Sequence, residues 1–264
     1  MLGRRIIQFF LIFTLGIICL MGVKYSLNLS DYVIPGPREI LTTGRSIFHE
    51  YLFDTMNTLI IAVIGQAISI FMAFFVGITA RQSTWAGTLI RAAAYNIQAY
   101  PIVAVAPIIF ILLGDGFTSR LLIAAMICYF PLLLSVIGIM AEPVVDIEHF
   151  YVATGRMHWQ LEVKIRAFEN MGKLTTVIAG SSTLAMAGTI VAEFIAANQG
   201  IGHSIRIALY QSDLARILVA LFLIGLFLSI YQEILESIGK RITSSLFLTK
   251  ECRLNKMSRN SAEL

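Results

Sequence analysis

The sequence predicts an all-α membrane protein, a polytopic bundle of about six transmembrane helices. Of the 264 residues, 57% are hydrophobic and the mean hydropathy is +0.79, which leaves too little polar surface to solvate a globule of this size. The chain also contains several separate runs of about 20 apolar residues, each long enough to cross a hydrocarbon core of roughly 30 Å as a helix. A soluble helical protein is the weaker alternative, because soluble cores rarely contain such a series.

Basic residues assign both termini to the cytoplasm. Most of the 20 Lys and Arg residues precede the first apolar run, follow the second, separate the fourth from the fifth, or follow the sixth, and the positive-inside rule assigns these segments to the cytoplasm. They form no single basic face, so we expect no nucleic-acid partner. Two of the three cysteines lie in apolar runs and one in the tail, which indicates free thiols rather than disulfides.

The spans are expected in a fixed order along the chain. No small-x-small cleavage site follows the first run, so we expect it to remain as an anchor rather than to be removed as a signal peptide. Polar residues in the second span need partners on neighbouring helices: Asn57, Gln66 and Ser69. An amphipathic stretch (39–52) outside the membrane precedes this span. The six predicted spans are 6–23, 56–80, 92–114, 121–141, 175–197 and 217–234. We divide the chain into an anchor with the start of an external segment (1–33), a core (34–240) with a cytoplasmic loop (146–174), and a basic cytoplasmic tail (241–264).

The third span contains two prolines that predict bends. Pro101 and Pro107 each remove a backbone donor, and a bent helix can line a path through the membrane. Asn96, Gln98 and Tyr100 lie just before the first bend. They are candidates for contact with a solute, but hydrogen bonds between helices near the interface explain them equally well.

The fifth span predicts close packing and an outer gate. Ser181, Ala185, Gly188, Ala192 and Ala196 recur at three- or four-residue intervals on one helical face, which is typical of tightly packed helices. Its one carboxylate, Glu193, lies about 27 Å along the helix from residue 175 and therefore near the external interface. A structural residue at the interface and a functional group at the outer mouth explain Glu193 equally well, and it stands alone as an ionisable group of the spans. Gly200 and Gly202 follow, and with Glu193 they are candidates for an outer gate rather than for an ion site.

The long loop 146–174 is the main polar interruption in the chain. A helical hairpin on the membrane surface, interrupted at Gly155, would present apolar anchors to a partner protein at helical intervals: Phe150, Tyr151, Met157 and Leu161. Residues 159–165 alternate with the period of a strand. We expect a helix, since an isolated strand there would leave backbone groups unpaired. A loop that merely rests on lipid headgroups is the alternative.

At these residues the chain resembles a known family. The spacing of Gly155, nine residues, then Ile165 resembles the coupling motif, often called the EAA loop, in permease subunits of binding-protein-dependent ABC importers. Three further stretches resemble the nitrate, sulfonate and taurine branch: IPGPREIL (34–41), YPIVAVAPIIFILLGDG (100–116) and VAEFIAANQGIGHSI (191–205). The Glu-Ala-Ala of the motif falls on His149, Phe150 and Tyr151, and its later Leu-Pro pairs are replaced by Ala167-Phe168 and Met171-Gly172.

The resemblance implies a type I ABC importer permease in a bacterial inner membrane. A cytoplasmic ATPase would bind loop 146–174, including Trp159 and Ile165, an external solute-binding protein would deliver an anionic or vitamin-precursor-like solute, and a second permease copy would complete the path. The chain has no G-x-x-x-x-G-K-[ST] sequence, so ATP hydrolysis is expected in the partner. We expect no catalytic residue, metal site or cofactor here. The alternatives are an ion-coupled secondary transporter, a permease-like protein without ATPase coupling and, more weakly, an intramembrane serine protease.

Overall fold

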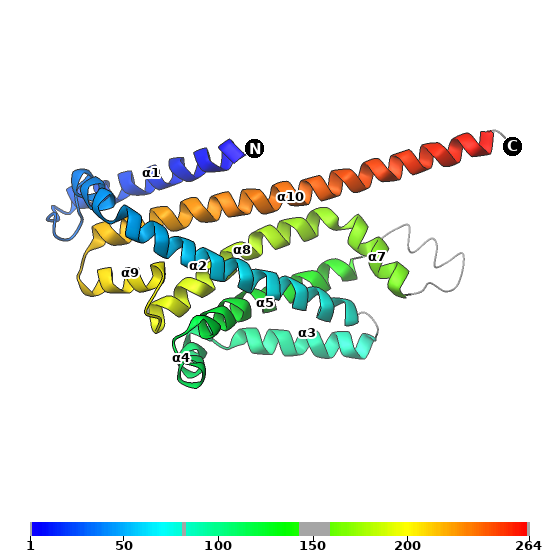
Figure 1. Cartoon of the computed structure of the whole chain (residues 1–264), viewed down its shortest axis with the longest axis horizontal. Coiled ribbons are helices and arrows are strands. Elements are labelled where there is room, and N and C mark those ends of the chain that lie inside the picture. Colours follow the sequence, from blue (N-terminus) through cyan, green and yellow to red (C-terminus); the bar gives the residue numbers. More distant parts are fainter. Residues whose placement is uncertain (1, 81–82, 143–158, 263–264) are drawn as a thin grey trace.

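The computed structural model describes residues 2–80, 83–142 and 159–262, and every regular element in these ranges is a helix (Figure 1). Five helices contain an apolar segment long enough to cross a membrane, and α3 with α4 can form a sixth, broken span. The prediction of an all-α membrane protein with about six spans is confirmed. In chain order the helices are α1 (Leu2–Ser26), α2 (Pro37–Thr79), α3 (Thr84–Ala99), α4 (Ile102–Leu113), α5 (Phe117–Ala141), α7 (Trp159–Glu169), α8 (Met171–Ile195), α9 (Ile201–Tyr210) and α10 (Leu214–Ala262).

The centre of the bundle is α5, which packs between α2 and α8 through small residues. A Cβ added at Gly65 on α2 would lie 3.2 Å from the Ala124 Cβ, and one added at Gly188 on α8 would lie 3.0 Å from the Ala124 Cα. Contacts this close exclude larger side chains and let the three backbones approach one another. The small face predicted for the fifth span is confirmed as a packing face. Its buried members are Ser181, Ala185, Gly188 and Ala192.

Two of the three polar side chains predicted to need partners in the second span, Gln66 and Ser69, form hydrogen bonds with neighbouring helices. The Gln66 Nε2 donates to the Ser181 Oγ at 2.9 Å, and the Tyr231 hydroxyl donates to the Gln66 Oε1 at 2.6 Å. The Ser69 hydroxyl lies 2.9 Å from the Ala125 carbonyl oxygen. These bonds join α2 to α5, α8 and α10, so no water is needed to satisfy the groups.

Two helices are longer than predicted. The expected external stretch 39–52 and the second span form one helix, α2, of 43 residues, or about 65 Å at 1.5 Å per residue. Residues 45–64 contain neither glycine nor proline, so nothing in the sequence stops the helix at the membrane surface. Similarly, α10 is 49 residues long, contains no proline and continues from the sixth span into the predicted tail.

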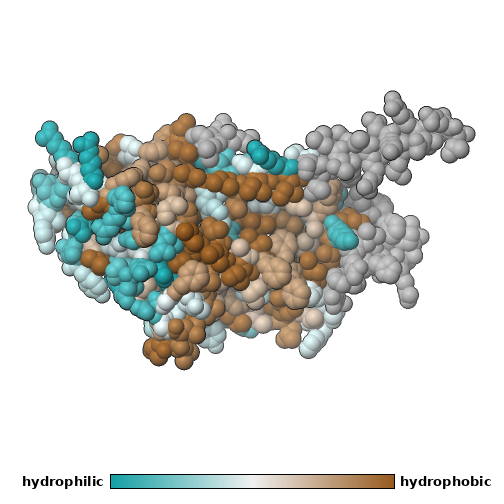
Figure 2. Space-filling model, viewed as in Figure 1, coloured by the Kyte–Doolittle hydropathy of each residue, from teal (hydrophilic) through white to brown (hydrophobic). Residues whose placement is uncertain are grey.

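The connections alternate between the two ends of the bundle (Figure 1). One end, called here the α9 end, holds α9, the α1–α2 connection and the start of α10; the other holds α7 and the α2–α3 connection. Hydrophilic side chains gather at the α9 end of the visible face and hydrophobic ones cover its middle (Figure 2). This alternation is the one that the predicted topology requires, while the assignment of each end to a side of the membrane stays a prediction.

Candidate translocation site

The third span is broken at Tyr100 and Pro101. Helices α3 and α4 meet there at 87°. Pro101 lacks an N–H and disfavours a helical conformation at the residue before it, and Tyr100 accordingly takes an extended conformation with φ −75° and ψ 129°. The bend predicted at Pro101 is therefore a complete break of the helix.

No helix break occurs at the second proline. Pro107 is the sixth residue of α4, which continues to Leu113. A bend was predicted at each proline; the helix is broken at Pro101 but continues through Pro107. Pro107 sits in the middle of an apolar helix whose inner face packs on α5 and α8.

The predicted polar candidates lie together at the end of α3. Asn96, Gln98 and Tyr100 are all exposed in the single chain, and Tyr100 is 68% exposed. Within the described residues no helix of this chain covers them, so the alternative of hydrogen bonds to neighbouring helices is not found. The break thus leaves polar side chains and helix-end backbone groups on an open face of the bundle.

Glu193 lies two residues before the end of α8 and is completely buried. Its Oε2 accepts hydrogen bonds from the Thr58 hydroxyl at 2.7 Å and from the Gly202 N–H at 3.1 Å. The Arg120 Nη1 lies 3.5 Å from its Oε1 and 3.4 Å from the Gln199 carbonyl oxygen, and Arg120 is only 6% exposed. Glu193 therefore belongs to a buried ion pair and does not stand alone as the sequence suggested.

The two predicted glycines lie against this carboxylate. Gly200 has φ +97°, and a Cβ there would lie 2.2 Å from the Glu193 Oε1. A Cβ at Gly202 would lie 2.5 Å from the Ile190 carbonyl oxygen and 2.8 Å from the Glu193 Cβ. The structure thus brings Glu193, Gly200 and Gly202 together, and any side chain at either glycine would displace the carboxylate or the backbone of α8.

Helices α8 and α9 cap each other. Because Gly200 has no side chain, the N-terminus of α9 is capped from α8 by the Glu193 carboxylate, which also lies at the positive end of the α9 dipole. In return, Arg206 on α9 donates to the carbonyl oxygen of Ile195, the last residue of α8, at 3.0 Å, and to that of Ala197, just beyond the helix, at 2.8 Å. A side chain of each helix therefore holds the other, at the start of α9 and at the end of α8, on either side of their connection.

A cavity of about 460 Å³ lies beside Glu193 and the residues that contact it. Asp54 connects this cavity to α9, because it lines the cavity and accepts a hydrogen bond from the Ser204 hydroxyl on α9. The lining combines apolar side chains with carboxylate and amide groups that could orient a polar solute. It consists of Phe53, Asp54, Met56, Asn57, Ile60 and Gln199.

Sequence reasoning missed the partners of Glu193. Arg120 lies four residues after Gly116, close to the expected start of the fourth span, where a basic residue is ordinary, and nothing local distinguishes Thr58 or Arg206. Pairing between residues 73 apart in the chain has no local signature. The available signal was Glu193 itself, since a carboxylate within an apolar span requires a cationic or hydrogen-bonding partner.

Only part of the predicted coupling loop is described. Phe150, Tyr151, Gly155 and Met157 lie outside the described residues. Trp159, Leu161 and Ile165 lie on α7, so the expected helix, rather than a strand, is confirmed over 159–169. Ile165 is half-buried.

The second half of this loop is fastened to the end of α5. Arg166 on α7 is buried and donates to the Glu142 carbonyl oxygen, and Lys173 forms an ion pair with the Glu142 carboxylate. These two basic residues therefore have a structural role besides any effect on topology.

A bundle of about six spans, with one span broken and an ion pair sealed among the others, is the architecture of an integral membrane transport component. The chain belongs to the family of binding-protein-dependent transport system inner membrane components, which matches residues 65–243. This is a family of transport permeases and not of enzymes.

Two relatives are similar to this chain. The riboflavin transport system permease protein RibX of Chloroflexus aurantiacus is 39% identical over 133 residues, which cover 49% of this chain and 48% of that protein. The formylaminopyrimidine transport permease protein ThiX of Halalkalibacterium halodurans is 21% identical over 196 residues, or 74% of this chain and 78% of that protein. The first match thus spans about half of its relative. Neither is named for nitrate, sulfonate or taurine, so that branch stays a prediction.

Proposed function

We propose that this chain forms the translocation path of an ATP-driven importer, working as two permease copies with a cytoplasmic ATPase and an external solute-binding protein. The broken span carries the proposal. Irregular backbone at membrane depth is tolerated only where protein covers it or water fills a path beside it, because lipid cannot satisfy its polar groups. No part of this chain that the structure describes covers the break, so a second copy and a hydrated path between the copies meet the requirement.

The cargo is proposed to be a small organic solute of the vitamin or vitamin-precursor kind. The support is the printed names of the two relatives, one for riboflavin and one for formylaminopyrimidine. A direct test is uptake of labelled riboflavin and of labelled formylaminopyrimidine by vesicles that contain this chain with the ATPase and binding protein encoded beside it.

The path itself is tested by thiol labelling at the break. In a chain freed of its native cysteines, Gln98→Cys and Tyr100→Cys should react with a membrane-impermeant charged reagent, and the reaction should slow when solute is transported. Phe71→Cys on α2 is the matched control, because Phe71 is 74% exposed on an apolar face and should meet lipid. Labelling of Phe71→Cys alone would place the path elsewhere.

Glu193, Gly200 and Gly202 are proposed to shape the outer gate. The reason is that α9 is held across the end of the bundle by contacts that depend on all three residues. Gly202→Leu should abolish transport per inserted molecule, whereas Glu193→Gln, which keeps the acceptor for Thr58 and Gly202, should only reduce it. The opposite pattern would show a charge-specific role in place of a gate.

Loop 146–174 is proposed to couple the permease to the ATPase, with Gly155 as its pivot. We expect Gly155 to take a positive φ between two amphipathic segments, where a side chain would cost about 1 kcal/mol or more. Gly155→Val should insert normally while the ATPase no longer co-purifies and transport is lost. Undiminished ATPase binding in that variant would contradict the assignment. Transport that persists without ATP would instead favour an ion-coupled transporter.

A further inference from the structure

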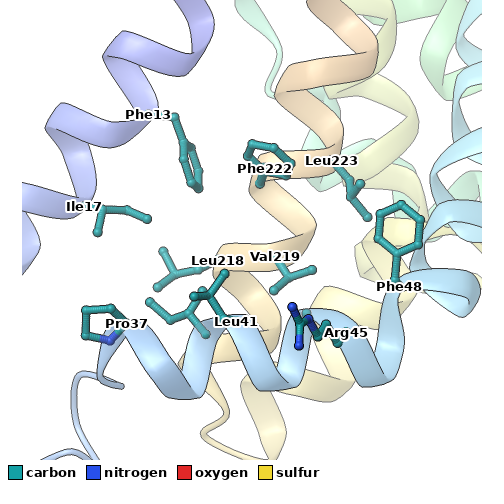
Figure 3. A pocket seen from close by; sticks show the side chains of 12 residues that line it. Phe13, Ile17, Pro37, Leu41, Arg45, Phe48, Leu218, Val219, Phe222 and Leu223 are labelled. Carbon is teal, nitrogen blue, oxygen red and sulfur yellow. The ribbon is translucent and has the colours of Figure 1, made fainter.

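A groove between α1, α2 and α10 lies at the α9 end of the bundle and is separate from the site described above (Figure 3). Its volume is about 640 Å³, within the range of roughly 300–1,000 Å³ for small-molecule sites. Arg45 is the one charged side chain in an otherwise apolar lining. The lining residues are Phe13, Ile17, Pro37, Ile40, Leu41, Gly44, Arg45, Phe48, Leu218, Val219, Phe222 and Leu223.

The groove exists because three helices meet at close contacts and then separate. A Cβ at Gly225 on α10 would lie 2.3 Å from the Phe9 ring, so α1 and α10 pack closely there. A Cβ at Gly44 on α2 would lie 3.5 Å from a Val219 methyl group, so α2 and α10 meet at the floor of the groove. Between these contacts nothing from the described part of the chain fills the space.

Two arginines on α2, at the groove, have no ion-pair or hydrogen-bond partner within the described residues. Arg38 and Arg45 are seven residues apart, which places them on one face of α2 about 10 Å apart along the axis. Both are exposed, and no ion pair or hydrogen bond of theirs is found within the described residues. By contrast Lys24, at the same end of α1, forms an ion pair with Asp31.

We propose that this groove binds an anionic phospholipid, with one acyl chain along the apolar lining and the phosphate on Arg45 and Arg38. The occupant must be apolar over its length and end in an anion, and a membrane supplies such a molecule in abundance. Arginine at the edge of the hydrocarbon region extends its guanidinium toward lipid phosphates. The proposal does not depend on transport, so it can hold or fail separately from the proposed function.

The test uses the full chain in nanodiscs with phosphatidylglycerol or phosphatidylcholine that carries a photoreactive diazirine on one acyl chain. We expect phosphatidylglycerol to cross-link to peptides of α1, α2 and α10 that line the groove. Arg45→Gln should lower this labelling about fivefold, the factor contributed by one arginine near an anionic surface. Arg91→Gln is the matched control, since Arg91 is exposed on α3 away from the groove.

A second variant tests the acyl chain separately from the headgroup. Leu218→Trp adds a ring to the groove and should lower labelling by both lipids, while Arg45→Gln should affect phosphatidylglycerol alone. Equal labelling by the two lipids that Arg45→Gln leaves unchanged would overturn the proposal. So would a disulfide between two copies through Leu41→Cys, because a second protein chain would then occupy the groove.

Discussion

Glu193 places a carboxylate inside the helix bundle, and Arg120 is the charge that balances it. The pair joins α5 to α8, and Thr58 and Gly202 supply the remaining hydrogen bonds to one carboxylate oxygen. The Arg120 Nε is buried and has no hydrogen-bond partner among the described residues.

Removing both charges of this pair should destabilise the protein less than the two single removals add up to. Glu193→Gln and Arg120→Met each leave the other group buried without its counter-charge, at an expected loss of about 3 kcal/mol each. The double variant should lose clearly less than the sum of the two. Reversible unfolding by SDS in mixed micelles measures the three values, and strict additivity would mean that the 3.5 Å contact carries no coupling.

Gly200 offers a second test at the scale of one residue. Gly200→Ala should cost about 1–2 kcal/mol from the positive φ alone, and more because the new Cβ would overlap the Glu193 carboxylate. Gly116→Ala is the matched control, since Gly116 also precedes a helix but has φ −78° and nothing within 4 Å of an added Cβ. Thermal melting in detergent compares them. Equal losses would remove the argument for close approach at Gly200.

Among the helices, α4 is the element whose direction depends most on one residue. Pro101→Ala restores a backbone N–H and frees Tyr100 to become helical, so α3 and α4 should straighten toward one span. Pro107→Ala should leave the 87° angle and transport unchanged, because Pro107 already lies within a helix. Distances between spin labels on Leu89 and Leu112 measure the angle. An unchanged distance in Pro101→Ala would show that tertiary packing, not Pro101, sets the break.

Helix existence was predictable from the sequence, while several helix ends were not. Apolar runs identified the five helices of membrane-spanning length and the broken pair α3 and α4, because lipid leaves no other way to satisfy the backbone. The ends of α2 and α10 were missed because a hydropathy change marks the membrane surface and not the end of a helix. At Pro101 the sequence contained the signal for a break, but the same residue type at Pro107 lies inside a continuous helix, so a proline alone does not predict where a helix ends.

At the scale of the whole molecule, the contacts between distant residues could not be read from the sequence. The small face of α8 predicted that some helix would approach closely, but not that Ala124 of α5 would lie between Gly65 and Gly188. The sequence did draw attention to Glu193, Gly200 and Gly202, because a carboxylate within an apolar span and two glycines just after it are unusual. Arg120 and Arg206 resembled ordinary loop cations, and only the folded chain brings them to Glu193 and to the end of α8.

The topology of the whole chain is the last prediction. Ser30 in the α1–α2 connection and Gln211 after α9 are exposed at the α9 end of the bundle, and Ser83 before α3 is exposed at the opposite end. If both termini are cytoplasmic, a membrane-impermeant thiol reagent applied to intact cells should label Ser30→Cys and Gln211→Cys but not Ser83→Cys or Met157→Cys. Permeabilised cells should show labelling at Ser83→Cys, which controls for its reactivity. Labelling of Ser83→Cys and Met157→Cys in intact cells would reverse the orientation, and the outer gate at Glu193 would then face the cytoplasm.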